Sequence, residues 1–420
     1  MAHYIEIINF GPVDECSVDV DGLTVLTGPQ ASGKSTIAKA IYFFRTIKDE
    51  IFDLAINPML LGSFTDNLRH RLLFKFRNIF GIPELNKDAR LRYYYNKRNP
   101  KSYVDISLAN YFAHPFSASV GSEFSQLITE ITSQNEWYKE FQTVNLKNML
   151  SQVFNDDYET IYIPSGRSTI SLLYKQLPYM LATMEDWQLK DIDYCTRKFI
   201  ELTLKVRPWF TKNRANKIYE SSNPSILEVQ QLSQKTLGAK YLYEKNAESL
   251  NFIRNNELNS IELNYASSGQ QEAVWVFNLL TYYQAEGKKI FSIIEEPEAH
   301  LHPEAQYNLI KAITTFCNHT TSQAMITTHS PYVLSSFNNL LYAGKMGKVS
   351  QFQAKLQEII PKTTWLDPDI FNAYIQEDGQ TRSIIDSDLS MINLEELDAV
   401  AARQDDEYEQ MLALSKEVDK

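Results

Sequence analysis

Nine consecutive residues, GPQASGKST at positions 28–36, have the types and spacing that bind a nucleotide phosphate. The chain has only 14 glycines, and the pattern GxxxxGK[ST] uses two of them in fixed register. We expect the backbone N–H groups of residues 30–35 to surround the β-phosphate. Lys34 would reach the β- and γ-phosphates, and the Ser35 hydroxyl would bind magnesium. The alternative is a helix cap without a ligand. The predicted phosphate-binding residues are Gly28, Pro29, Gln30, Ala31, Ser32, Gly33, Lys34, Ser35 and Thr36.

The segments on either side of this motif fit a phosphate-binding loop. Leu23–Thr27 (LTVLT) has the pattern of a short buried strand, and Ser35–Phe44 that of a helix with one apolar face. A strand, a loop and a helix in this order form the geometry that such a loop requires.

A second chemical group follows the apolar strand Ile290–Ile294, in the stretch IIEEPEAHLHP. Adjacent strand residues point to opposite sides, so the two acids after the strand cannot do the same job. We assign Glu295 to magnesium and Glu296 to the polarisation of an attacking water. The alternative is an acidic helix start with a proline in its first turn. His300 and His302 lie two apart without a third partner, which favours structural or interface roles over metal binding.

The stretch NYASSGQQEAVWVF provides a helix start that can hold an anion, because free N–H groups gather at a helix N-terminus. The residues at this start are Ser267, Ser268, Gly269 and Gln270. The alternative is an ordinary N-cap by one of the two serines, with Glu272 in the first turn.

His329 is the fourth candidate, in AMITTHSPYVLSSF. It follows the predicted strand Ala324–Thr328, and ligands of parallel sheets bind at the carboxyl ends of the strands. The alternative is a histidine whose nitrogens bond to neighbouring backbone.

The elements that position these groups divide the chain into four segments. Residues 1–53 form a first lobe with the phosphate-binding loop, and 54–158 form an insertion of helices plus a β-hairpin with its turn at Asn99–Pro100. Residues 159–345 form an alternating strand and helix core, and 346–420 form a small cap and an acidic tail.

Composition limits the class of protein. The 420 residues exceed one ordinary core, and the net charge of −11 argues against a chain that coats nucleic acid over its whole surface. Neither a signal peptide nor an apolar run long enough for a membrane span is expected. Three cysteines without metal spacing fit a reducing cytoplasm.

Taken in order, GPQASGKST, SSGQQ, IIEEPEAHLHP and TTHSP resemble the ABC-type ATPases of the RecF/SMC/OLD group. EEPEAHLHP followed by TTHSP is typical of OLD-like ATPases in bacterial anti-phage systems. The resemblance implies that Ser267 is a signature serine, which contacts the γ-phosphate held by a partner copy. It implies that His329 is the switch histidine and that EAHLHP is the D-loop at the dimer interface.

This sequence departs from the family pattern in three places. Glu295 stands where many ABC proteins have Asp, and its longer side chain should still reach Mg²⁺ through water. The Q-loop position is best matched by SGRS, where Arg167 could touch phosphate or a neighbouring carboxylate. The alternative is an ordinary surface arginine. The C-terminal segment lacks the pattern of a Toprim nuclease, and we do not expect Asp367, Asp369 and Glu377 to form a nuclease centre.

The resemblance implies an α/β fold, an ABC-type P-loop ATPase head with a mixed sheet and flanking helices, interrupted by a mainly helical insertion. It implies ATP and Mg²⁺ as ligands, an ATP-dependent homodimer or higher oligomer, no membrane, and control of a separate nuclease or toxin, as in Septu-, PARIS- and retron-type systems. One alternative is a RecF/SMC-like repair ATPase that binds DNA, and another is an ATP-bound scaffold with little turnover. DNA would meet the basic helix that carries Arg69, Arg71, Lys75 and Arg77, although such a face is more often only solvated.

Overall fold

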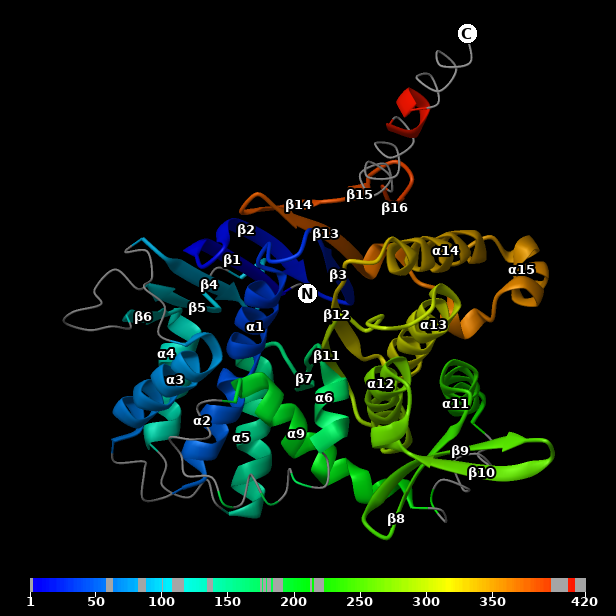
Figure 1. Ribbon diagram of the computed structural model, residues 1–420. Helices are drawn as coiled ribbons and strands as arrows, with labels where there is room; N and C mark the ends of the chain where they lie inside the picture. Colours follow the sequence, from blue (N-terminus) through cyan, green and yellow to red (C-terminus); the bar gives the residue numbers. More distant parts are fainter. Residues whose placement is uncertain are drawn as a thin grey trace.

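A mixed β-sheet with helices on both faces organises the described part of the chain (Figure 1). The computed structural model describes residues 3–57, 63–81, 88–99, 101–107, 117–133, 139–173, 176, 179, 183, 192–211, 214, 223–393 and 407–411. Within these residues the sheet has eleven strands in the order β6-β5-β4-β1-β2-β14-β13-β3-β12-β11-β7. The predicted α/β fold class is therefore confirmed.

The strands and helices have the following bounds. The strands of the main sheet are β1 (His3–Phe10), β2 (Val13–Val20), β3 (Leu23–Thr27), β4 (Arg90–Tyr94), β5 (Tyr103–Ser107), β6 (Ser117–Val120), β7 (Glu159–Ile163), β11 (Ile290–Glu295), β12 (Gln323–Thr327), β13 (Phe371–Glu377) and β14 (Gln380–Ser383). The α-helices are α1 (Lys34–Arg45), α2 (Ile47–Ala55), α3 (Phe64–Phe80), α4 (Ser122–Ser133), α5 (Glu140–Val153), α6 (Arg167–Leu173), α9 (Tyr194–Val206), α11 (Pro224–Leu237), α12 (Ser268–Ala285), α13 (Pro303–Thr320), α14 (Pro331–Gly347) and α15 (Gln353–Ile359). A smaller antiparallel sheet contains β8 (Lys240–Glu244), β9 (Ala247–Arg254) and β10 (Glu257–Glu262), and a third contains β15 (Ile385–Asp386) and β16 (Met391–Ile392).

Five neighbouring strands, β13, β3, β12, β11 and β7, run parallel to one another. Their carboxyl ends therefore meet at one edge of the sheet, which is where parallel sheets bind ligands. The bounds of β3 agree with the predicted strand Leu23–Thr27, and α1 agrees with the predicted helix Ser35–Phe44 to within one residue at each end.

The central strands are buried on both faces, so successive residues belong to two different apolar cores. In β3, Val25 packs with the core that includes α12, α13 and α14, whereas the next residue, Leu26, packs with α1, α2 and α3. In β11, Ile294 packs with the first of these cores and Ile293 with the second. This explains the continuous apolar runs of these strands, because a strand with helices on both sides has no solvent face.

The segment 54–158 extends the main sheet. Its strand β4 pairs antiparallel with β1, and β5 and β6 continue the sheet outward. The predicted hairpin is the β4–β5 pair, although Pro100 of its predicted turn lies outside the described residues. The strands of this segment therefore share one sheet with the strand of the phosphate-binding loop.

The C-terminal segment corrects an expectation. We expected 346–420 to form a small cap and tail, but β13 lies inside the main sheet, parallel to β3 and antiparallel to β14. Its polar Gln376 is completely buried, and buried polar residues weaken the apolar signal of a strand. After β12 the chain therefore re-enters the main sheet, where β13 pairs with the edge of β3 that faces away from β12.

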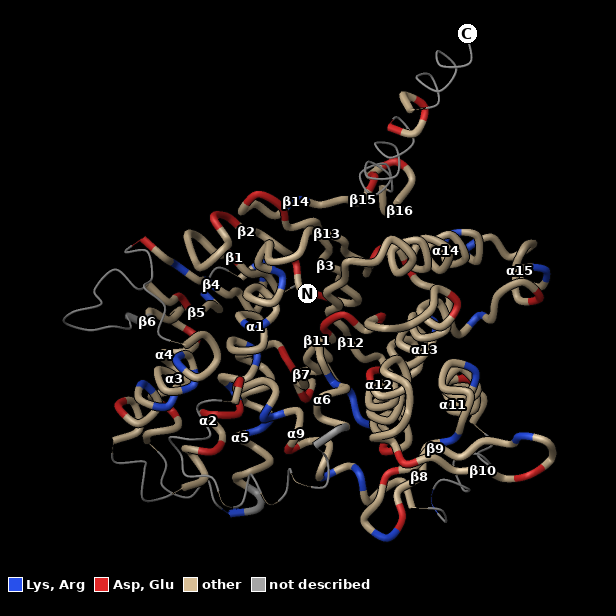
Figure 2. The backbone as a smooth tube through the Cα atoms, in the orientation of Figure 1, with Lys and Arg blue, Asp and Glu red and all other residues tan. Residues whose placement is uncertain are grey.

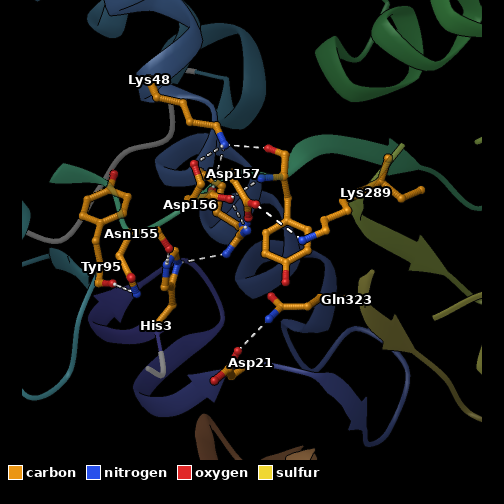
Figure 3. A network of polar contacts seen from close by, with 12 residues as sticks. His3, Asp21, Lys48, Tyr95, Asn155, Asp156, Asp157, Lys289 and Gln323 are labelled. Carbon is orange, nitrogen blue, oxygen red and sulfur yellow. Dashed lines mark hydrogen bonds and ion pairs between the residues drawn. The ribbon is translucent and has the colours of Figure 1, made fainter. Parts of the chain in front are cut away.

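A buried polar network fixes the far end of α1 (Figure 3). Arg45 and Lys48 form ion pairs with Asp156 at 3.0 and 3.1 Å, and Arg45 Nη1 is 2.8 Å from His3 Nδ1. Burial and the Arg45 charge lower the pKa of His3 to about 3, so this ring is neutral at physiological pH. The network joins β1, α1, α2 and the loop before β7.

In the parts of the chain that the structure describes, we find no helix that is both long and apolar enough to cross a membrane. Cys16, Cys195 and Cys317 are all buried and free.

Candidate nucleotide-binding site

The loop between β3 and α1 holds three residues in conformations with positive φ, namely Gly28 (138°), Ala31 (61°) and Gly33 (110°). A Cβ atom on Gly28 would lie 2.1 Å from the carbonyl oxygen of Gln376 in β13. One on Gly33 would lie 2.8 Å from Cγ2 of Val13 in β2. Both glycines are therefore required by close packing as well as by φ. The neighbouring strands fix the loop in shape.

The ammonium group of Lys34 lies over this loop. It donates to the carbonyl oxygens of Gly28 at 2.9 Å and Pro29 at 2.6 Å. Burial lowers its pKa to about 8, and the charges of Glu296 and Glu298 oppose this shift. The charge of Lys34 is thus held near the loop and near the end of β11. Other loop residues, Pro29, Gln30, Ala31 and Ser35, are exposed, whereas Ser32 and Thr36 are half-buried.

Glu295 is the last residue of β11 and is buried. Its Oε2 accepts a hydrogen bond from the backbone N–H of Ser165 at 3.3 Å, while its Oε1 is buried without a hydrogen-bond partner. A carboxylate oxygen in this condition fits a hydrated cation, because Mg²⁺ keeps several waters and takes oxygen ligands. Ser35 is exposed at the start of α1. These residues fit a magnesium ion that also takes phosphate oxygens.

Glu296 and His329 approach each other across neighbouring strand ends. Oε1 of Glu296 lies 3.3 Å from Nε2 of His329, and both side chains are partly exposed. Glu296 has a φ of 42°, and its N–H donates to the carbonyl of Thr327 at 2.9 Å. A non-glycine residue in this conformation is uncommon, and such strain concentrates at functional sites.

Glu298 positions the backbone of His329, a role that the sequence motifs do not indicate. Its Oε1 accepts hydrogen bonds from the hydroxyl of Thr328 at 2.5 Å and from the N–H of His329 at 3.1 Å. Burial raises the pKa of this carboxyl group. Glu298 therefore holds the backbone that carries the histidine. In the sequence, the signal for this residue is its place as the third acid of EEPE.

The residues of SSGQQ form the start of α12. Ser267 is the N-cap in a capping box, since its side chain accepts from the N–H of Gln270 and the Gln270 side chain accepts from its N–H. This confirms the cap that was the structural alternative, with Gln270 in place of Glu272. Ser267 and Ser268 remain exposed. A Cβ on Gly269 would lie 2.7 Å from the carbonyl oxygen of His300, so the helix start packs on the EAHLHP loop.

The helices that follow the two motifs, α12 and α1, pack on opposite faces of the sheet. The buried residues of α12 lie in one core and those of α1 in the other. No hydrogen bond or ion pair within the described residues joins 267–270 to 28–36.

Arg167 is not an exposed phosphate ligand. Its side chain is completely buried and forms an ion pair with Glu272, with Nε 3.3 Å from Oε2. Its guanidinium also donates to backbone carbonyl oxygens of neighbouring elements. Of the two expected roles, contact with a neighbouring carboxylate is the one that the structure contains. The prediction of a phosphate contact fails because the donors are already used inside the fold.

Comparison with known proteins decides the family. A family model described as an AAA ATPase domain matches residues 1–176 and 185–334. The chain belongs to the AAA ATPase domain family. The match covers the phosphate-binding loop, the start of α12, both acids after β11 and His329. No curated protein matches the chain.

Solved structures similar to this ATPase-family chain include heads of SMC proteins. One is an SMC head bound to the C-terminal winged-helix domain of ScpA, with 12% identity, a TM-score of 0.40, and coverage of 91% of this chain and 96% of that one. Another, derived from Pyrococcus furiosus, is an SMC head with an extended coiled coil bound to the C-terminal domain of ScpA (11% identity, TM-score 0.38, 96% and 98% coverage). A third is the SMC head domain from Thermotoga maritima (10% identity, TM-score 0.38, 91% and 98% coverage).

The basic helix of this ATPase-family chain, α3, is only partly available to a ligand. Lys75 is buried, and its ammonium lies 2.9 Å from Oε1 of Glu50. Arg71 lies 3.7 Å from the other oxygen of the same carboxylate. Figure 2 shows acidic and basic residues interspersed around α2 and α3. Two of the four cations named for the DNA-binding alternative, Arg71 and Lys75, are therefore engaged by Glu50.

The remaining candidates have structural contacts. His302 is the N-cap of α13 and accepts from the N–H of Glu304 at 3.4 Å. Asp367 and Asp369 both bind Lys348, at 2.9 and 2.8 Å. In the described residues, no group of three or more His, Cys, Asp or Glu side chains that could hold a metal is present.

Proposed function

We propose that this chain binds and hydrolyses ATP in an ATP-sandwiched homodimer or higher assembly of the ABC type. The observation that carries the proposal is the division of the site. Lys34, Glu296 and His329 gather at one edge of the sheet, whereas the exposed start of α12 belongs to a helix on the opposite face from α1, and no hydrogen bond within the described residues joins it to the phosphate-binding loop. A second copy placed head to tail would bring its Ser267 over the γ-phosphate, and two identical sites would form about a two-fold axis.

Each residue of the site has a role in this reaction. The loop N–H groups and Lys34 bind and orient the phosphates, and the partner's α12 start closes the site against water. Glu296 accepts the proton of the attacking water, and His329 orients that carboxylate. Ser35 and Glu295 would hold Mg²⁺, which neutralises charge on the phosphates when it is bound.

Three observations support ATP hydrolysis over an ATP-bound scaffold with little turnover. The carboxylate of Glu296 is partly exposed and therefore able to meet water. Its backbone is fixed by the hydrogen bond to Thr327, and its partner His329 is fixed by Glu298. Steady-state turnover of the purified protein tests this directly. Phosphate release that needs Mg²⁺ and is lost in Glu296→Gln supports hydrolysis, whereas ATP binding without turnover favours the scaffold.

We further propose that the ATPase controls a separate effector, a nuclease or a toxin, in the cytoplasm of a bacterium that defends itself against phage. This part rests on the resemblance of EEPEAHLHP and TTHSP to OLD-like ATPases. It is tested by expression with the neighbouring reading frames and measurement of plaque formation. Protection that requires both Lys34 and a neighbouring gene supports it. The alternative, a RecF/SMC-like repair ATPase, predicts turnover stimulated by DNA and sensitivity to DNA damage.

A further inference from the structure

Arg167 and Glu272 form a completely buried ion pair between α6 and α12. The two side chains are 0% and 1% exposed. The carboxylate of Glu272 accepts hydrogen bonds from the backbone N–H groups of Arg167 at 3.0 Å and Ser168 at 2.9 Å, which are the first of α6. Nε of Arg167 also donates to the carbonyl oxygen of Glu272 at 2.8 Å. The start of α6 is thus attached to Glu272 of α12 both through its backbone N–H groups and through the Arg167 side chain.

The other end of the same guanidinium holds the two acids of the candidate site. Nη1 of Arg167 donates to the carbonyl oxygens of Pro164 and Glu295, both at 2.7 Å. Nη2 donates to the carbonyl oxygen of Glu296 at 3.0 Å. Glu296 is the residue with a φ of 42°, so one arginine stabilises the unusual backbone on which its carboxylate depends.

These contacts form a direct connection from the start of α12 to Glu296. Glu272 follows Ser268 by one helical turn, and a helix moves as a rigid unit over that distance. A displacement of the α12 start therefore moves Glu272, and through it the guanidinium that binds the Glu296 carbonyl. Arginine suits this task because its planar group keeps several hydrogen bonds in fixed directions.

We propose that the Arg167–Glu272 pair couples the two composite sites. ATP bound by one copy contacts the α12 of its partner, and through this pair it positions the Glu296 of that partner. This inference rests on the proposed function. In the dimer, the α12 of each chain touches the γ-phosphate bound by its partner, while the Glu296 of that same chain serves its own nucleotide. Arg167 and Glu272 are positioning residues, since neither is exposed to substrate.

Burial supports a specific role for the pair. Desolvation lowers the pKa of Arg167, although the nearby carboxylates oppose the shift. A buried ion pair by itself is weak evidence for stability, because the cost of removing charges from water offsets the attraction. A second buried pair, Arg207 and Glu248, lies 3.1 Å apart beside Trp275 of α12 and provides a control pair that contacts the same helix.

The test compares Arg167→Lys and Glu272→Gln with the controls Arg207→Lys and Glu248→Gln. We expect the two coupling variants to retain ATP affinity, measured by calorimetry. Their kcat should fall roughly 10- to 100-fold, the effect of a misplaced catalytic group. The cooperativity of hydrolysis in ATP should also fall, with a Hill coefficient close to one. The double variant should lose no more than the worse single variant, because the two residues act as one unit.

Wild-type kcat and cooperativity in Glu272→Gln would overturn the proposal, as would non-cooperative hydrolysis by the wild-type protein. An equal loss of kcat in Glu248→Gln would also overturn it, because any buried pair would then have the same effect. If Arg167→Lys does not fold, the more conservative Glu272→Gln carries the test. Failure of the proposed function itself looks different, since Ser267→Arg would then hydrolyse ATP at the wild-type rate.

Discussion

Nε2 of His329 lies 3.3 Å from Oε1 of Glu296, although 33 residues separate them in the chain. The two residues follow β12 and β11, which are adjacent parallel strands, so the sheet brings them together. Hydrogen bonds to Thr327 and Glu298 fix the backbone of each. A carboxylate and an imidazole held in this way can orient a water for attack on a phosphate.

Lys34→Ala should reduce ATP affinity about 10- to 100-fold, because charge-assisted hydrogen bonds contribute roughly 1.5–3 kcal/mol. Isothermal calorimetry measures this. Lys198→Ala, on a side chain that is 42% exposed and paired with Glu201, is the control and should bind ATP normally. Unchanged affinity in Lys34→Ala would contradict the assignment of the phosphate-binding loop.

The pKa of Lys34, lowered to about 8, predicts a pH dependence of ATP binding. Above pH 8 the free lysine loses its proton, whereas bound phosphate favours the charged form. ATP binding should therefore take up a proton above pH 8, and affinity should fall as pH rises through that value. Calorimetry in buffers of different ionisation enthalpy measures the proton uptake. Its absence in the wild type, or its persistence in Lys34→Ala, would exclude Lys34 as its source.

Glu296→Gln should lower kcat about 10²- to 10⁴-fold while ATP binding remains, since loss of a general base has this magnitude. ATP that is not hydrolysed should also stabilise the closed dimer, which light scattering detects. Glu304→Gln changes an exposed acid paired with Lys235 at 2.8 Å, and it should hydrolyse ATP normally. A wild-type rate in Glu296→Gln would mean that another group is the base.

A chain ending before residue 371 should fail to fold stably, because it lacks β13, the neighbour of β3. Gln376 of β13 also forms the wall against which Gly28 packs. A chain ending at residue 393 keeps β13 to β16 and is the control. Thermal unfolding distinguishes the two. Cooperative unfolding and normal ATP affinity in the shorter chain would show that β13 is dispensable.

The sequence predicts best those features that depend on local spacing. The loop, β3 and α1 follow from one short pattern, because phosphate chemistry requires glycines, a lysine and a hydroxyl in fixed register. The strands β11 and β12 are apolar runs that end in polar residues, so the edge that gathers the acids and His329 is also predictable.

Features that depend on distant contacts are not predictable in this way. Arg167 is 105 residues from Glu272, and only the fold reveals that this arginine is buried and paired. The strand β13 pairs with β3 across almost the whole chain, and its buried Gln376 conceals it. Glu298 looks like any acid at a helix start until Thr328 and His329 are placed beside it.

The central claim is that two chains share each ATP site, and mixed dimers test it most directly. Ser267→Arg should leave ATP binding largely intact but block closure and hydrolysis, because a large side chain would occupy the α12 start. Lys34→Ala removes binding on the other side of the same site. When the Ser267→Arg and Lys34→Ala chains are mixed, the mixed dimers contain one site that carries both changes and one site that carries neither.

Hydrolysis by this mixture is the decisive measurement. The account predicts that activity returns on mixing, to a fraction of the wild-type rate set by the share of mixed dimers. A control mixture of Lys34→Ala with Glu296→Gln should stay inactive, because both changes lie in the same chain's half of the site and leave each site with one defect. No activity on mixing Ser267→Arg with Lys34→Ala, in dimers shown to have formed, would contradict the shared site.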